Sequence, residues 1–187
     1  MRPIDAVPRP HRGEPRAALV TRFESALAAR DGAAGAACVH ELWMRGEIGP
    51  NVERALEQLW SAAAPSVPDW LPMRHVEWLP SVYEIAARCR AEARGRSNLY
   101  LVLLDYRDRG GDPYGIYVGM SDYPAGERFD QHKAGIRAAG SVLKRGLEVL
   151  TGPVLHLQRI SRAEAGRIEA ELAEALRAAG LIVRGGH

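Results

Sequence analysis

The chain has 187 residues, 47% of them hydrophobic and 26% charged, and a formal net charge of +2. This length suits one or two small domains, and the composition excludes a fibrous or broadly disordered protein. Cys38 and Cys89 are far apart and show no CxxC spacing, so the sequence indicates neither a disulfide framework nor a structural zinc site. Because no long apolar run or signal peptide is visible, we expect a cytoplasmic protein without membrane contact.

The N-terminal half is predicted to be mostly helical. Residues 1–16 contain four prolines and four arginines with little apolar content, which predicts a flexible basic arm. Residues 17–96 carry helical apolar spacing, interrupted by a proline-rich crossing that contains Trp70 and Trp78. Two pairs have the spacing of capping boxes, Thr21 with Glu24 and Ser81 with Glu84. We expect helices over residues 17–29, 35–44, 51–63 and 81–94.

The C-terminal half, residues 97–187, is predicted to alternate strands and helices. The apolar segment 99–106 and the segment GIYVGM at 115–120 predict a hairpin across a turn-forming cluster. A helix follows Pro124 to about Ile136, and the alternating segment 153–159 predicts a third strand. A capping box at Ser161 opens a helix to Ala179, before a short strand at 181–184. The predicted class is therefore α+β, a small mixed sheet in the order β-β-α-β-α-β after a helical region.

Basic side chains are concentrated between residues 128 and 145. This segment has five basic residues and one acid, an excess that could attract a phosphate backbone. The basic residues are Arg128, Lys133, Arg137, Lys144 and Arg145. A solvated helix face would have the same composition, so charge alone does not decide between the two interpretations.

Two tyrosine-bearing segments followed by an arginine and a histidine carry the most specific signal. Asn98-Leu99-Tyr100 and Tyr117-Val118-Gly119 lie on the two strands of the predicted hairpin. The C-terminal half resembles the GIY-YIG nuclease superfamily over roughly residues 97–187. The letters GIY at 115–117 overlap the second motif, and one tyrosine cannot occupy two strands. The family arrangement therefore implies that Tyr100 belongs to the first motif and Tyr117 to the second.

The resemblance extends to the following helices. Arg128 comes nine residues after Gly119, and His132 lies one helical turn further, on the same face. Restriction-type members of the family place an arginine and a histidine at this spacing in the site. Four glutamates occupy the later helix, and the alanine four residues before Glu169 matches the family pattern, which selects Glu169 as the metal-binding residue. Taken singly, each of these residues is more often structural.

The resemblance implies a metal-dependent endonuclease that hydrolyses phosphodiester bonds in DNA, with RNA as the alternative substrate. Glu169 would hold one divalent cation, Mg²⁺ or Mn²⁺, and Arg128 would offset charge on the phosphoryl oxygens. Tyr100 would activate the attacking water, with His132 and Tyr117 supplying positive charge or relaying the proton. The remaining residues expected to contact substrate are Gly119, Lys133, Lys144 and Arg145.

Two departures from the family pattern leave other functions open. The chain has no asparagine beyond Asn98, so Arg184 or His187 would have to replace the family asparagine. The first motif also reads NLY instead of GIY. A catalytically inactive nucleic-acid-binding or protein-interaction module with the same fold is the alternative, and a defence protein or toxin would use the same chemistry. In the endonuclease interpretation, the N-terminal helices would provide substrate recognition, dimerisation or a partner surface.

Overall fold

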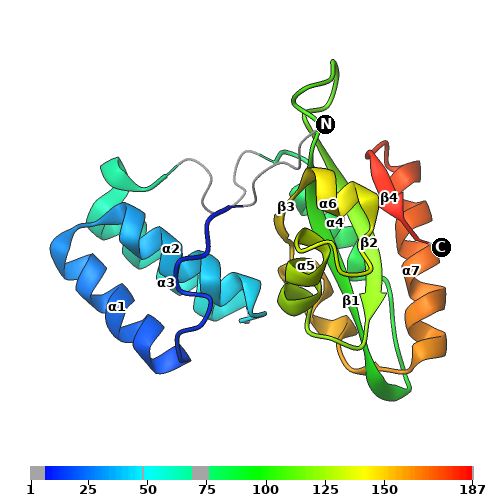
Figure 1. Cartoon of the computed structure of the whole chain (residues 1–187), viewed down its shortest axis with the longest axis horizontal. Helices are drawn as coiled ribbons and strands as arrows, with labels where there is room; N and C mark the ends of the chain where they lie inside the picture. Colours follow the sequence, from blue (N-terminus) through cyan, green and yellow to red (C-terminus); the bar gives the residue numbers. More distant parts are fainter. Residues whose placement is uncertain (1–6, 48, 69–75, 187) are drawn as a thin grey trace. The chain divides into compact units, whose positions relative to one another are not determined.

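The structure, a computed structural model, describes residues 7–47, 49–68 and 76–186. The chain divides into two compact units, one over Pro8–Glu77 and one that comprises Val7 and the chain from Trp78 onward (Figure 1). The first unit is helical, and the second contains a four-stranded mixed sheet with helices around it. The predicted α+β class and the helical N-terminal region are confirmed at this level. Within the described residues no helix has both the length and the apolar character needed to span a bilayer.

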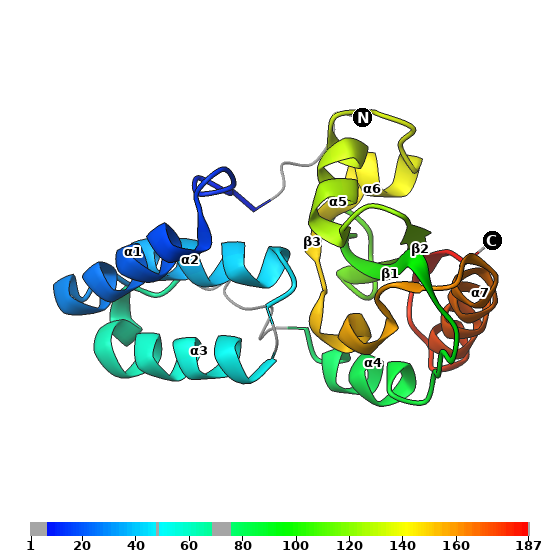
Figure 2. The ribbon, with the colours of Figure 1, turned by 90° about the horizontal axis from the view of Figure 1, so that it is seen from below.

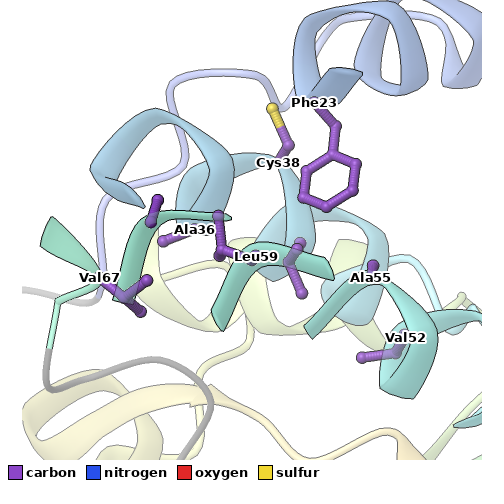
Figure 3. Close-up of a cluster of buried hydrophobic side chains, with 9 residues drawn as sticks. Phe23, Ala36, Cys38, Val52, Ala55, Leu59 and Val67 are labelled. Atoms are coloured by element: carbon purple, nitrogen blue, oxygen red, sulfur yellow. The ribbon is translucent and has the colours of Figure 1, made fainter. Parts of the chain in front are cut away.

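The described residues of the N-terminal unit form three helices and one short 3₁₀ helix: α1 (Arg16–Ala29), α2 (Gly32–Met44), α3 (Gly49–Ala63) and η1 (Ala64–Ser66). Their apolar faces meet in one cluster that includes Phe23, Cys38 and Leu59 (Figure 3). Asp31 caps α2, because its side chain accepts a hydrogen bond from the Ala34 N–H at 3.0 Å. The capping box predicted at Thr21 is wrong, since α1 begins at Arg16 and Thr21 lies inside it.

A buried carboxylate ties the segment before α1 to α2. Glu41 is fully buried and pairs with Arg9 at 2.8 Å and with Arg45 at 2.6 Å. Burial alone would raise the pKa of Glu41, but the hydrogen bonds from the two guanidinium groups outweigh it and hold this pKa below its ordinary value. Arg45 also donates to the carbonyls of His11, Arg12 and Glu14. The described part of the predicted arm therefore lies against α2.

The C-terminal unit follows the predicted order with one additional helix before its third strand. Its elements are α4 (Leu79–Ala86), β1 (Arg94–Asp105), β2 (Tyr114–Ser121), α5 (Ala125–Lys133), α6 (Gly140–Arg145), β3 (Gly146–Val149), η2 (Gly152–Leu157), α7 (Arg162–Ala178) and β4 (Val183–Gly185). The strand order is β3-β1-β2-β4, with β4 parallel to β2 and the other neighbours antiparallel. Helices α5 and α6 lie on one side of β1 and β2, and α4 lies on the other (Figure 2).

The boundary between the units differs from the predicted one. The prediction placed residues 17–96 in the helical region, whereas α4 belongs to the unit that begins at Trp78. The physical reason is packing: Val82 and Ala86 are fully buried, and α4 contacts η2 and α7. The helix begins at Leu79 without a side-chain cap and ends at Ala86, so the predicted capping box at Ser81 and the predicted end near residue 94 are wrong.

The third strand lies earlier than expected. Residues 153–159 were predicted to form it, but residues 152–157 form the 3₁₀ helix η2, and the strand is β3. In η2 the buried residues Val154 and Leu157 recur at a spacing of three, which fits a 3₁₀ turn. The capping box at Ser161 is confirmed, because the Ser161 hydroxyl accepts from the Glu164 N–H at 3.3 Å.

Candidate active site

The register of the β1–β2 hairpin places Tyr100 and Tyr117 on one face of the sheet. Tyr100 lies opposite Gly119, and Tyr117 lies opposite Val102. The two tyrosines are thus diagonal neighbours, and their ring centroids are 5.9 Å apart. Gly119 makes this possible, since a Cβ on it would lie 2.6 Å from a Tyr117 ring carbon and 2.8 Å from the Tyr100 hydroxyl. A side chain at Gly119 would occupy the space that the tyrosines use.

His132 joins the two tyrosines from helix α5. Its ring centroid is 6.1 Å from that of Tyr100 and 6.0 Å from that of Tyr117. The His132 Nε2 atom and the Tyr100 hydroxyl are hydrogen bonded at 2.8 Å. We call these three residues the tyrosine–histidine cluster. Tyr100 and His132 are each 1% exposed, whereas Tyr117 is half-buried, so Tyr117 is the member that solvent reaches most easily.

The hydrogen bonds of His132 define its tautomer. The Ala139 backbone N–H donates to His132 Nδ1 at 2.9 Å, and a backbone amide can only donate. Nδ1 must therefore carry the lone pair, which puts the proton of the neutral ring on Nε2 and makes His132 the donor to Tyr100. Burial, assisted by the Arg128 charge, lowers the pKa of His132 to about 4. Near neutral pH, His132 contributes a hydrogen-bond donor and not the positive charge expected from the sequence.

The two phenols differ in how strongly their surroundings resist ionisation. Burial raises the pKa of Tyr100, Tyr117 raises it further, and Arg128 opposes both effects. Burial also raises the pKa of Tyr117, although its hydrogen bond with Tyr100 and the charge of Arg128 lower it in part. Both groups are neutral phenols at pH 7. A base role for either one requires the cation beside them and a change in solvation.

Arg128 acts on the whole cluster while its guanidinium closes the end of α5. Its charge affects the pKa values of Tyr100, Tyr117 and His132. The same guanidinium donates to the Gln131 side chain at 3.0 Å, and to the carbonyls of Ile136 at 3.2 Å and Arg137 at 2.8 Å. These bonds fix the position of the guanidinium. A cation held in this way is preorganised to stabilise a charged oxygen near the tyrosines.

Glu169 approaches the cluster from α7. Glu169 is 8% exposed, and its negative charge raises the pKa of Tyr117. The chain at the end of β4 passes close to both β2 and α7, because a Cβ on Gly185 would lie 3.0 Å from the Tyr117 ring and one on Gly186 would lie 3.4 Å from the Glu169 backbone carbonyl oxygen. Both glycines have positive φ, which favours glycine there. Tyr100, Tyr117 and His132 therefore lie together, the charge of Arg128 acts on all three, and the charge of Glu169 acts on Tyr117.

The basic residues predicted to contact substrate are placed differently. The Lys133 ammonium donates to the carbonyls of Leu143 and Gly146, at 3.3 and 3.1 Å. The Arg145 side chain is 7% exposed, pairs with Asp108 at 2.6 Å and stacks on the Tyr106 ring at 4.5 Å. Lys144 is exposed. Lys133 and Arg145 thus support the fold around β3 and the β1–β2 turn.

Neither predicted replacement for the family asparagine is seen beside the cluster. Arg184 donates from Nε to the Tyr106 hydroxyl at 3.2 Å, and His187 lies outside the described residues. Two parts of the site were missed from the sequence. The Ala139 amide leaves no side-chain signal, whereas the paired glycines at 185–186 could have indicated the close approach of β4 to Tyr117 and Glu169.

The donors beside the cluster fit a hydrated divalent ion and not a protein cage. Across residues 7–47, 49–68 and 76–186, no three His, Cys, Asp or Glu side chains are placed to hold a metal together. Glu169 offers one carboxylate, and Mg²⁺ is commonly held by one or two carboxylates with water and phosphate oxygens.

No protein-family model, curated protein or solved structure matches this chain.

Proposed function

We propose that the C-terminal unit is a metal-dependent endonuclease of the GIY-YIG type that hydrolyses phosphodiester bonds in DNA. The observation that carries this proposal is the convergence of Tyr100, Tyr117, Arg128, His132 and Glu169 from four separate elements. A proton acceptor, a fixed cation and a carboxylate that can hold a metal ion are groups that phosphodiester hydrolysis can use.

Each residue would have a separate catalytic role that follows from its position. The tyrosine pair would orient the attacking water and take its proton, with Tyr117 the more accessible hydroxyl and Tyr100 the hydroxyl held by His132. The His132 Nε2–H would stabilise negative charge on the Tyr100 oxygen. Arg128 would offset charge on the phosphoryl oxygens, a contribution worth about 3 kcal/mol for a well-placed donor.

Glu169 would hold the divalent ion, Mg²⁺ or Mn²⁺. When bound, such an ion stabilises the leaving oxygen and polarises the phosphate. The carboxylate comes from the second turn of α7, and β4 packs beside it. Its approach to Tyr117 would place metal and phenol on the same side of the substrate.

A second candidate is a nucleic-acid-binding module that keeps the fold without cleavage. Tyr100 is 1% exposed, and burial raises its pKa, both of which oppose a base role in this conformation. Binding alone would need neither ionisation of Tyr100 nor a metal at Glu169.

A nicking assay with point variants separates the two candidates. Supercoiled plasmid would be incubated with Mg²⁺ or Mn²⁺ and the wild-type chain, Glu169→Gln, Tyr100→Phe or Tyr117→Phe. We expect the wild type to cleave, and each variant to lose roughly 10²- to 10⁴-fold in rate. Each substitution keeps the shape of the side chain, so a loss would report chemistry and not packing.

Tyr106→Phe is the matched control. Tyr106 is also buried, at 3% exposure, and its hydroxyl also has a partner, Arg184. It lies beyond β1, away from the cluster, and its loss should leave cleavage unchanged. A wild-type chain that cleaves neither DNA nor RNA would refute the nuclease and favour the binding module. Cleavage that persists in Glu169→Gln would refute the metal assignment.

A further inference from the structure

Arginines gather where β1 begins and where the chain enters α7. The segments 88–96 and 159–164 carry six arginines and two glutamates. The starts of β1 and α7 lie at the same end of the sheet (Figure 1). This excess of positive charge is outside the segment 128–145 that the sequence singled out.

Backbone hydrogen bonds hold the two segments side by side. The Gly95 N–H donates to the Arg159 carbonyl at 3.0 Å, and the Ser161 N–H donates to the Ala93 carbonyl at 2.8 Å. A Cβ on Gly95 would lie 2.8 Å from the Ile160 carbonyl carbon, closer than real side chains come. The glycine within Arg94-Gly95-Arg96 is therefore what lets the second segment approach.

Four of these arginines present their charge to solvent, and we call them the arginine edge: Arg94, Arg96, Arg159 and Arg162. All four are exposed. Among the residues that the structure describes, Arg94, Arg159 and Arg162 make no side-chain ion pair or hydrogen bond, and Arg96, 89% exposed, reaches Asp122 only at 3.8 Å. The nearby Glu164 carboxylate accepts from the N–H groups of Glu92 and Ala93.

Arg159 keeps an unfavourable backbone conformation at this edge. Its φ is 56°, a left-handed value that is unfavourable for a residue other than glycine. Its N–H donates to the Asn98 side-chain oxygen at 3.0 Å and its carbonyl accepts from Gly95, so both backbone groups fix it. An arginine stands where glycine or asparagine would be less strained.

A neighbouring hollow is a weaker candidate for an anion. It has a volume of about 600 Å³ and is bordered by three arginines and three glutamates, namely Arg88, Arg90, Arg167, Glu92, Glu164 and Glu171. These charges cancel, and Arg167 already pairs with Glu171 at 2.7 Å. The attraction for phosphate therefore lies on the open edge.

The arginine edge leads directly to the candidate active site. Tyr100 lies four residues beyond Arg96 on the same strand, about 13 Å at 3.3 Å per residue. Glu169 lies seven residues beyond Arg162 on α7, about 10 Å at 1.5 Å per residue. These spans equal roughly three to four nucleotide steps at 3.4 Å each, so one duplex could contact both places.

We propose that the arginine edge binds the phosphate backbone of the nucleic acid to one side of the bond that is cut. This inference rests on the proposed nuclease function, because it assigns the path of that substrate. In this proposal the exposed arginine edge takes the role of substrate contact that the sequence predicted for Lys133 and Arg145. The side chains of Lys133 and Arg145 bind instead to groups of the protein itself. Binding through the edge is electrostatic and independent of base sequence.

The salt dependence of duplex binding tests the edge. Affinity for a labelled 20-base-pair duplex would be measured by fluorescence anisotropy between about 50 and 200 mM salt, with chelator present to prevent cleavage. For Arg94→Gln/Arg162→Gln we expect the slope of log affinity against log salt to fall by about 1–2, and affinity at 0.1 M salt to drop roughly tenfold or more.

Arg107→Gln/Arg109→Gln is the matched control. It removes the same formal charge from two exposed arginines of the same unit, in the turn after β1, of which Arg107 pairs with Asp105 at 2.6 Å. The slope should stay at the wild-type value. An unchanged slope in the edge variant, or an equal fall in the control, would overturn the inference. If the wild type also cleaves plasmid, that result leaves the nuclease proposal standing. A reduced slope without any cleavage supports the edge and refutes the nuclease.

Discussion

Gly119 lies beneath both tyrosine rings, and its hydrogen atom occupies the place of a side chain. Gly119→Ala would put a Cβ 2.6 Å from Tyr117 and 2.8 Å from Tyr100. We expect unfolding to become easier by about 1–3 kcal/mol, because overpacking forces the rings to move. Cleavage should fall with the loss of the Tyr100–His132 hydrogen bond.

Gly166→Ala provides the contrast in a denaturant titration and a nicking assay. Gly166 lies in α7, and the nearest atom to an added Cβ is the Met120 sulfur at 4.0 Å. Alanine there should stabilise the helix by roughly 0.5–1 kcal/mol. Equal unfolding free energies and equal cleavage rates for Gly119→Ala and Gly166→Ala would show that the rings tolerate a side chain at Gly119.

His132 makes stability depend on pH in a defined direction. Its pKa falls from an ordinary 6.5 to about 4 in the folded chain, so between these values the unfolded chain binds more protons. Stability is complete above about pH 6.5 and decreases as the pH falls toward 4, by up to about 3 kcal/mol from this residue.

The measurement is the unfolding free energy at several pH values for the wild type and His132→Gln. Glutamine can accept from the Ala139 N–H and donate to Tyr100, so folding should survive while the pH dependence becomes shallower. Parallel curves for the wild type and His132→Gln would contradict the assignment of the neutral ring to His132.

For single residues, the sequence predicted that Tyr100, Tyr117 and His132 lie close together, but not the protonation state of His132. The spacing of Tyr100, Tyr117, Arg128 and His132 could be interpreted from strand alternation and the helical repeat. The neutral tautomer of His132 could not, because it depends on the Ala139 amide and on burial, and neither is encoded in a motif. Whether these residues catalyse hydrolysis stays a prediction.

Arg145 links α6, the β1–β2 turn and the end of β1. It donates to the Asp105 carbonyl at 2.7 Å and to both Asp108 oxygens, at 2.6 and 2.9 Å. Arg145→Ala should cost about 1–3 kcal/mol of stability, because the buried guanidinium loses its hydrogen bonds to the Asp105 carbonyl and to the half-exposed Asp108 carboxylate. Lys144→Ala, at the exposed neighbouring position, should change stability by less than about 0.5 kcal/mol.

Thermal and chemical unfolding of the two variants would test this difference. Duplex affinity should stay close to wild type for Arg145→Ala whenever the variant is folded. A large loss of affinity with unchanged stability would instead make Arg145 a substrate contact, as the sequence had predicted.

Elements were predictable where local signals agreed with packing. The hairpin and the Ser161 cap followed from short-range chemistry, and both appear in the structure. Segment 153–159 failed because its apolar spacing fits either a strand or a 3₁₀ turn, and tertiary packing selected the turn. Strand β3 was missed because it is an edge strand of only four residues, and the buried Glu148 interrupts its apolar pattern.

The two units have separate cores, so a destabilising substitution in one core should lower the unfolding free energy of that unit. Leu59 is fully buried in the cluster of the N-terminal unit (Figure 3). Leu59→Ala should cost about 2–5 kcal/mol, and the loss should appear in that unit. The boundary near residue 77 escaped prediction because α4 looks like its helical predecessors, and only its burial against η2 and α7 assigns it to the second unit.

The reactivity of the two cysteines can show whether the two units unfold separately. Cys38 is fully buried in the N-terminal core, and Cys89 is half-buried in the other unit. In Leu59→Ala, labelling of Cys38 by a thiol reagent should accelerate at least tenfold, whereas labelling of Cys89 should keep its wild-type rate. Acceleration at both sulfurs would mean that the two units unfold together.

The hydrogen bond from His132 to Tyr100 has a consequence for how the site can be observed. A ring N–H that is 1% exposed and hydrogen bonded should exchange slowly with water and give a resolved downfield proton resonance. Nitrogen-15 shifts of the same ring would distinguish a protonated Nε2 from an unprotonated Nδ1. That resonance should vanish in Tyr100→Phe by faster exchange and shift when a duplex is added. The integrity of the cluster could thus be followed spectroscopically, without any turnover.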